Sequence, residues 1–170
     1  MKKFLLALFS MVGITVAAQA QPAELYFGYG GYTQMDACDM HDGGKVNTAW
    51  GAVTAGVNFR VAPKFWIGPS YTFSSSSYKH SDANIYYHVI MLNARYEYWR
   101  NSIVTLYGHF GIGADISHMT WDDDSENKGY FAVQVTPLGA QVGISRSATM
   151  FGEIGFGAQG LVQVGMRFNL

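Results

Sequence analysis

The sequence is short of cysteine and of charge, and both shortages exclude classes of protein. A single cysteine, Cys38, excludes an intramolecular disulfide framework and any zinc site built on cysteine pairs. Charged residues make up 14% of the chain, against about 25% in ordinary domains, and with 15% aromatic residues the chain is not a disordered one. The formal net charge is −1. Nothing in it indicates a nucleic-acid partner, for which a clustered basic face would be expected. The 170 residues have room for one domain.

Long hydrophobic runs are also missing, except near the start of the chain. Met1-Lys2-Lys3 is positive, residues 4–17 are mostly apolar, and Ala18-Gln19-Ala20 places small residues where signal peptidase cleaves. An apolar stretch of about 14 residues is too short to span a bilayer, which needs about 20. We therefore predict a signal peptide at residues 1–20, cleavage after Ala20, and a mature domain at residues 21–170.

The mature chain has an alternation of apolar and polar residues instead of apolar helices. It is clearest at residues 104–117, where Val104 and Ile112 share one face and Tyr107 and His109 share the other. Strands are predicted at residues 23–33, 48–61, 65–75, 85–99, 103–117, 130–144, 149–157 and 161–170. The phase changes at Thr136-Pro137, which predicts a β-bulge because proline cannot donate a ladder hydrogen bond.

The connections between these strands alternate in length. Long polar connections lie at residues 34–47, 76–84 and 118–129, and short turns lie at residues 62–64, 100–102 and 145–148. Long loops alternating with tight turns are typical of an up-and-down barrel that crosses a membrane. The predicted fold is therefore all-β, an eight-stranded antiparallel up-and-down transmembrane β-barrel.

The polar face of the strands differs from an ordinary solvent surface, because it is rich in Gly, Ser, Thr and Asn and almost without Lys. Its charged residues are of both signs, and arginine forms bidentate contacts with carboxylates inside proteins. We predict a charge network in the lumen that consists of Glu24, Arg60, Arg95, Glu97, Asp115, Glu153 and Arg167.

Aromatic residues gather near both ends of the strands, as lipid interfaces favour. Examples are Tyr86 and Tyr87 at one end and Phe65 and Trp66 beside a tight turn. The alternative is a soluble periplasmic barrel that binds an apolar ligand, with its aliphatic side chains inside and its charges outside.

The last residues, Gln163–Leu170, resemble the C-terminal assembly signal of Gram-negative outer-membrane proteins, in which a polar residue, a glycine and two hydrophobic residues recur. The matching positions are Gln163, Gly165, Phe168 and Leu170. The whole mature chain resembles the small eight-stranded barrels of the OmpA/OmpX-like superfamily. This resemblance implies a monomer in the cell outer membrane that contacts outer-membrane lipid and lipopolysaccharide and is recognised by the barrel-assembly machinery.

Two of the long loops contain residues of metal-ligating type. They are Cys38 and His41 in the first loop, and Asp122 and Asp124 in the third. The first pair lacks the four ligands of a stable zinc site, and the second lacks the spacing of an EF-hand. We predict neither a metal nor a cofactor.

Some barrels of this size modify lipid A, so a lipid-modifying acyltransferase or deacylase is an alternative function. Such chemistry needs a serine close to a histidine that a carboxylate orients. Ser117 and His118 are of the right types, but neighbours in a strand point to opposite faces. No catalytic residue is predicted.

Eight strands leave an interior just wide enough for side chains, which excludes a wide pore. The sequence therefore predicts a structural or adhesive scaffold with a filled polar lumen. Its loops, at residues 34–47, 76–84 and 118–129, would be presented to an extracellular ligand.

Overall fold

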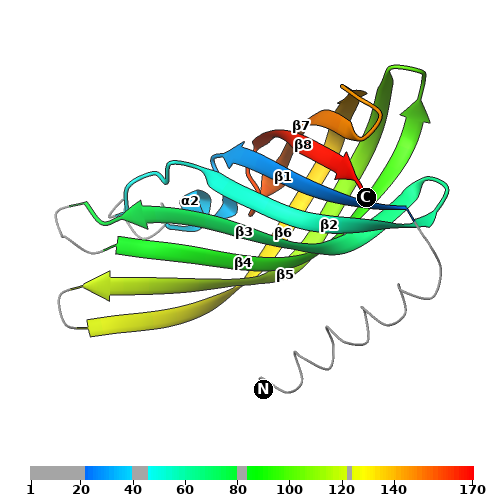
Figure 1. Ribbon diagram of the computed structural model, residues 1–170. Coiled ribbons are helices and arrows are strands. Elements are labelled where there is room, and N and C mark those ends of the chain that lie inside the picture. Colours follow the sequence, from blue (N-terminus) through cyan, green and yellow to red (C-terminus); the bar gives the residue numbers. More distant parts are fainter. Residues whose placement is uncertain (1–21, 40–45, 80–83, 122–123) are drawn as a thin grey trace.

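The computed structural model describes residues 22–39, 46–79, 84–121 and 124–170. Eight strands form one closed barrel in which each strand pairs with its neighbours in chain order (Figure 1), and every pair is antiparallel. The elements are β1 (Ala23–Gly31), α2 (Gln34–Asp39), β2 (Ala52–Ala62), β3 (Phe65–Ser77), β4 (Asn84–Arg100), β5 (Val104–Trp121), β6 (Asp124–Gly143), β7 (Ala148–Gly157) and β8 (Val162–Asn169). The predicted fold class is confirmed. In the described part of the chain, no helix is long and apolar enough to cross a membrane.

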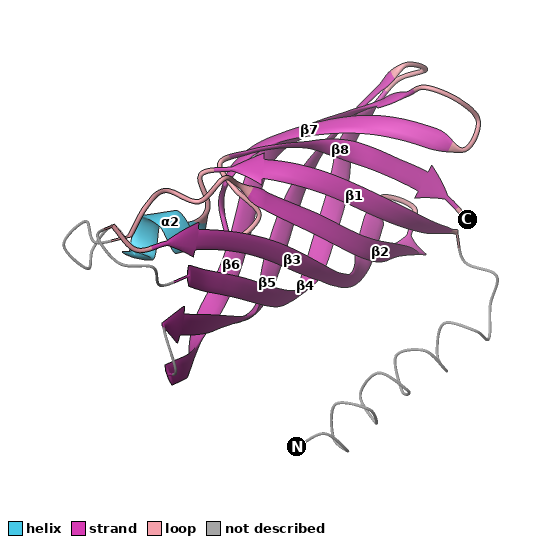
Figure 2. Cartoon of the chain, turned by 60° about the vertical axis from the view of Figure 1, so that its left-hand side comes forward, coloured by secondary structure: helices cyan, strands magenta, loops and turns pink. Residues whose placement is uncertain are grey.

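The barrel has two different ends (Figure 2). The turn end holds the start of β1, the end of β8 and the tight connections that follow β2, β4 and β6. There the Asn101 side chain accepts hydrogen bonds from the backbone N–H groups of Ile103 and Val104, at 2.8 and 2.6 Å. The loop end holds α2 and the connections that follow β1, β3, β5 and β7.

Side chains alternate between the interior and the outer surface, as the strand period requires. On β4, Tyr87 and Met91 are buried while Ile90 and Leu92 are exposed. We call the outward hydrophobic residues the apolar belt; its members include Phe27, Val53, Ile90, Ile112, Ile154 and Val164. A soluble barrel does not expose such a continuous apolar surface, so the alternative of a soluble periplasmic barrel is wrong.

The last strand closes the barrel against the first. The register runs from Glu24 opposite Asn169 to Gly31 opposite Val162, and the Leu170 N–H donates to the Ala23 carbonyl at 2.9 Å. Within the proposed assembly signal, Gln163 is buried in the lumen. Phe168 packs edge-on against Phe27, with ring centroids 6.5 Å apart.

The bulge predicted at Thr136-Pro137 is confirmed. The pairing of β6 with β7 shifts between Val135 and Leu138, and the pairing of β5 with β6 shifts between Tyr107 and His109. The chain thereby accommodates a residue that has no N–H to donate.

Two predicted loops need correction. Residues 118–129 are largely a continuation of β5 and β6, paired out to Trp121 opposite Asp124; polar residues on both faces of this hairpin hide its strand period. The loop predicted at residues 34–47 begins with α2, because Thr33 and Asp36 bond to each other around the start of the helix in the manner of a capping box. The predicted signal peptide at residues 1–20 lies outside the described residues and stays a prediction.

Candidate functional site

The turn-end half of the lumen contains two buried arginines among carboxylates. Arg95 is bidentate to Glu24, with its Nη2 3.0 Å from Oε2 and its Nη1 2.5 Å from Oε1. The same Nη2 lies 3.5 Å from Glu97 Oε1. Glu97 also accepts a hydrogen bond from the indole N–H of Trp66 at 2.9 Å.

The second arginine, Arg167, is paired with Glu153. Its Nη2 lies 2.9 Å from Glu153 Oε1 and donates to the Tyr107 hydroxyl at 2.9 Å. Tyr107 in turn donates to Glu153 Oε1 at 2.7 Å. The Nδ1 atom of His109 lies 3.0 Å from Glu153 Oε2.

Glu24 joins the two groups into one network, because its Oε1 lies 3.4 Å from Arg167 Nε. Aromatic rings cover the guanidinium groups: Arg95 lies 4.9 Å from the centroid of Trp66, and Arg167 lies 4.0 Å from that of Phe151. Buried charges are tolerated only when they are paired and hydrogen-bonded. We call Glu24, Arg95, Glu97, Glu153 and Arg167, with Tyr107, the lumen network.

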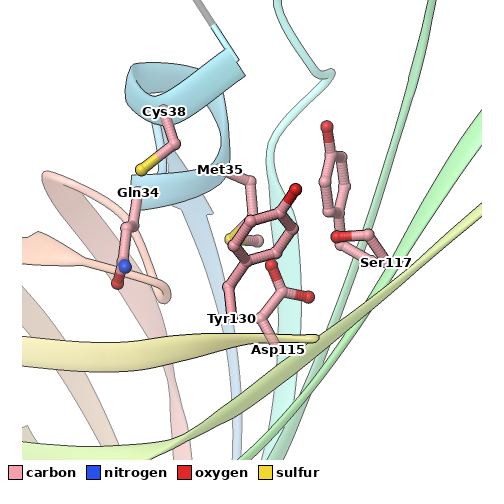
Figure 3. A pocket seen from close by; sticks show the side chains of 7 residues that line it. Gln34, Met35, Cys38, Asp115, Ser117 and Tyr130 are labelled. Carbon is pink, nitrogen blue, oxygen red and sulfur yellow. The ribbon is translucent and has the colours of Figure 1, made fainter. Parts of the chain in front are cut away.

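The structure thus brings five of the seven predicted lumen charges into one network and leaves Arg60 and Asp115 outside it, although the Arg60 guanidinium lies 5.9 Å from the centroid of Trp66. Arg60 lies at the turn end, where its guanidinium donates to the Pro63 carbonyl. Asp115 is buried near the loop end, beneath α2 (Figure 3).

Two members of the turn-end site were not predicted. Trp66, expected at a lipid rim, is buried in the lumen; its phase with Gly68 and Ser70 is the sequence signal that identifies it as inward. Arg100, whose side chain is 51% exposed, reaches in from the rim to lie 2.9 Å from Glu97 Oε2.

The loop-end half of the lumen contains an apolar cluster beside buried polar side chains such as Gln134 and Gln159, and this cluster was not predicted. The cluster consists of Met35, Val46, Ile85, Tyr87, Val89, Met91, Ala132 and Ala158. The part of β4 near the loop end is apolar on both faces, so its period does not reveal which face is inward. Tyr87, predicted at a lipid rim, is one of these inward residues.

A cavity of about 160 Å³ lies between α2 and strands β4 to β6. Figure 3 shows Met35 and Cys38 of α2 on one side and Asp115, Ser117 and Tyr130 on the other. Ser117 Oγ is buried and has no hydrogen-bond partner among the described residues. His118 follows Ser117 on the opposite face and bonds to Asn127 at 2.6 Å, so these two residues do not meet.

A second cavity, of about 260 Å³, opens at the turn end and reaches Glu24 and Glu97. Between the two cavities lie the lumen network and His109, whose Nε2 contacts Asn93 Oδ1 at 3.0 Å. These side chains lie in the lumen between the two mouths of the barrel.

The residues of metal-ligating type are not assembled into a site in the described part of the chain, where no three such side chains gather. Cys38 is exposed on α2. His41 and Asp122 lie outside the described residues, as does the side chain of Asp124 at the start of β6.

Comparison with known proteins gives a family and several similar folds. The family profile of the outer membrane protein beta-barrel domain matches residues 4–169. The crystal structure of Ail, the attachment invasion locus protein of Yersinia pestis, is 13% identical, with 89% of this chain and 96% of Ail covered and a TM-score of 0.50.

Ail in complex with the heparin analogue sucrose octasulfate is also 13% identical, with the same coverage and a TM-score of 0.51. The N-terminal β-barrel domain of Pseudomonas aeruginosa OprF is 11% identical, with 88% of this chain and 98% of that domain covered and a TM-score of 0.49. Identities this low bear on the fold alone. Comparison with the curated proteins gave no significant match.

Proposed function

This chain belongs to the outer membrane protein β-barrel domain family and lies in the outer membrane, and we propose that it acts there as a closed scaffold that presents its loop end to a partner outside the cell. The observation that carries this proposal is the combination of an apolar belt outside with a paired, buried charge network across the lumen. The belt anchors the barrel in lipid, and the network leaves no room for a wide pore.

The surface that we propose for partner binding is the hairpin at residues 118–129. On one side it extends beyond its neighbour, because β7 pairs with β6 only as far as Gln134, and on the other side β4 pairs with it out to Thr120. Residues 125–130 are all exposed. Backbone pairing of this part of β6 with β5 fixes the strand that carries these exposed side chains, so binding there needs less ordering than binding by a flexible loop.

The charge of the loop end favours a cationic or neutral partner. Residues 34–47, 76–84 and 118–129 contain eight acidic and three basic residues. Like charges repel across an interface, so a sulfated sugar, which Ail binds as the analogue sucrose octasulfate, is not the ligand that we expect here.

Shortening the hairpin tests the adhesive function. Residues 118–127 would be replaced by Asn-Gly, which makes a two-residue turn between the paired residues Ser117 and Lys128. Cells displaying the shortened barrel should bind host cells at least about tenfold less than cells displaying the wild type, a loss of about 1.4 kcal/mol.

The control is a substitution at the opposite end, Ser145→Ala, which alters a turn that faces away from the partner. Both variants would be compared at equal amounts of folded barrel, measured by heat-modifiable gel mobility. Equal binding by the shortened barrel and the wild type would refute the assignment of this hairpin.

A further inference from the structure

A groove of about 170 Å³ lies on the outside of the barrel at the loop end. Its walls come from Val133 on β6, Phe156 on β7, Leu161 in the connection to β8, and Tyr32 and Ala37 beside and within α2. It forms where β7 ends at Gly157 while β6 continues.

The polar groups around this groove are already bonded to the protein. Thr33 donates its N–H and its hydroxyl to Asp36 Oδ2, at 2.7 and 2.9 Å. The Gln34 side chain donates to the Phe131 carbonyl at 2.9 Å and accepts the Val133 N–H at 3.0 Å. The groove therefore offers an occupant mainly apolar contact.

The groove is continuous with the apolar belt. Phe156 and Leu161 are exposed. Ile154, two residues before Phe156, and Val162, directly after Leu161, are exposed on the same outward surface. Phe131, also exposed, flanks the groove on β6. In a bilayer, the acyl chains that cover the belt reach this groove without leaving the hydrocarbon region.

We propose that the groove binds an acyl chain of one membrane lipid from the leaflet that surrounds the loop end. An apolar cavity of about 150 Å³ accommodates a benzene molecule, so this groove has room for about six carbon atoms of a chain. Because the acyl chain moves from one hydrocarbon environment to another, its retention comes from van der Waals packing against the groove walls, which the flat remainder of the belt does not offer.

The backbone at Tyr32 supports this assignment. Among the described residues, Tyr32 is the one non-glycine residue with positive φ, at 49°. Such strain in a bulky residue persists only where its surroundings fix it, and it is found at ligand clamps. Here the Leu161 N–H bonds to the carbonyls of both Gly31 and Tyr32, at 2.9 and 3.0 Å, and the side chain of Tyr32 becomes a wall of the groove.

The test counts the lipids that stay bound to the full-length folded protein. The barrel would be folded into vesicles of palmitoyl-oleoyl phosphatidylcholine, extracted into detergent, washed, and examined by native mass spectrometry. We expect one retained phospholipid per wild-type barrel. Ala37→Phe fills the groove, and Tyr32→Asn removes a wall with a residue that tolerates the same backbone conformation; each should lower the retained fraction about tenfold, or about 1.4 kcal/mol.

The matched control is Tyr86→Asn, since Tyr86 is 38% exposed near the loop end of β4 while Tyr32 is 42% exposed. This variant should retain lipid like the wild type. Absence of retained lipid in the wild type, unchanged retention in the groove variants, or an equal loss in Tyr86→Asn would each overturn the proposal. If Ala37→Phe fails to fold, as judged by heat-modifiable mobility, Tyr32→Asn decides the question.

Discussion

At the scale of single residues, position decides whether a charge is tolerated in this barrel. Arg95 and Arg167 are buried, yet each guanidinium is within 3.0 Å of a carboxylate oxygen. In the sequence, both arginines fall on the same strand face as small polar residues, which indicates that they point into the lumen. Their partners depend on the register of strands distant along the chain, so the sequence does not identify which carboxylate each arginine meets.

Removal of Arg167 should be strongly destabilising. Arg167→Met leaves Glu153 without its arginine partner and takes a positive charge from Glu24, and breaking such a buried pair costs about 3–5 kcal/mol. The measurement is the free energy of unfolding by urea in lipid vesicles.

The control for this prediction is the double variant Arg167→Met with Glu153→Gln, which removes both charges of the pair. It should recover part of the lost free energy, because a buried carboxylate is no longer left without its arginine. A loss below about 1 kcal/mol in Arg167→Met would show that the network is solvated like a surface ion pair.

The outward direction of Ile112 gives a second prediction. Ile112→Arg places a charge in the apolar belt and should cost about 2–4 kcal/mol near the bilayer midplane, measured by the same unfolding. Ile112→Leu should cost less than about 1.5 kcal/mol.

The neighbouring inward position separates lipid effects from steric effects. A Cβ added at Gly111 would lie 2.4 Å from Asn93 Oδ1 and 2.8 Å from Met91 Cε, so Gly111→Leu should destabilise by overfilling, without any charge.

If Ile112→Arg were harmless while Ile112→Leu was not, the direction assigned to β5 would be wrong.

At the scale of elements, the regular alternation of apolar and polar residues predicts the strands. It does not predict strand extensions that are polar on both faces. The bulge in β6 could be predicted because Pro137 and the phase change coincide. The extension of β5 and β6 could not, since its backbone pairing requires no apolar face. The helix α2 was missed because its cap, Thr33 and Asp36, lies within a run of polar loop residues.

The last strand, β8, should control assembly. Phe168→Ala removes a hydrophobic residue of the proposed signal, and its ring contact with Phe27 across the closing pair of strands. We expect several-fold less protein in the outer membrane, measured by fractionation and immunoblotting.

Phe110→Ala is the matched control for β8, because Phe110 is an outward phenylalanine on β5. It should leave the outer-membrane level close to that of the wild type. An equal fall in both variants would mean that lost packing, and not recognition of β8, lowers the level.

At the scale of the whole molecule, the sequence predicts the closed barrel, the direction of most strands and the inward charges, but not the apolar cluster near the loop end. The turn-end half of the lumen follows from inward charges such as Glu97 and Glu153. The apolar cluster depends on how α2 places Met35 against Met91 and the other inward residues of β4, which is a tertiary arrangement that no strand period contains.

The central claim is that side chains close the lumen of a barrel that is anchored in the outer membrane. Uptake of arabinose by phospholipid vesicles containing the folded wild-type protein tests this claim most directly, with an open porin as the positive control. The structure predicts swelling no faster than that of protein-free vesicles, because the lumen network lies between the two mouths. Rapid swelling that scales with the amount of folded protein would contradict the account.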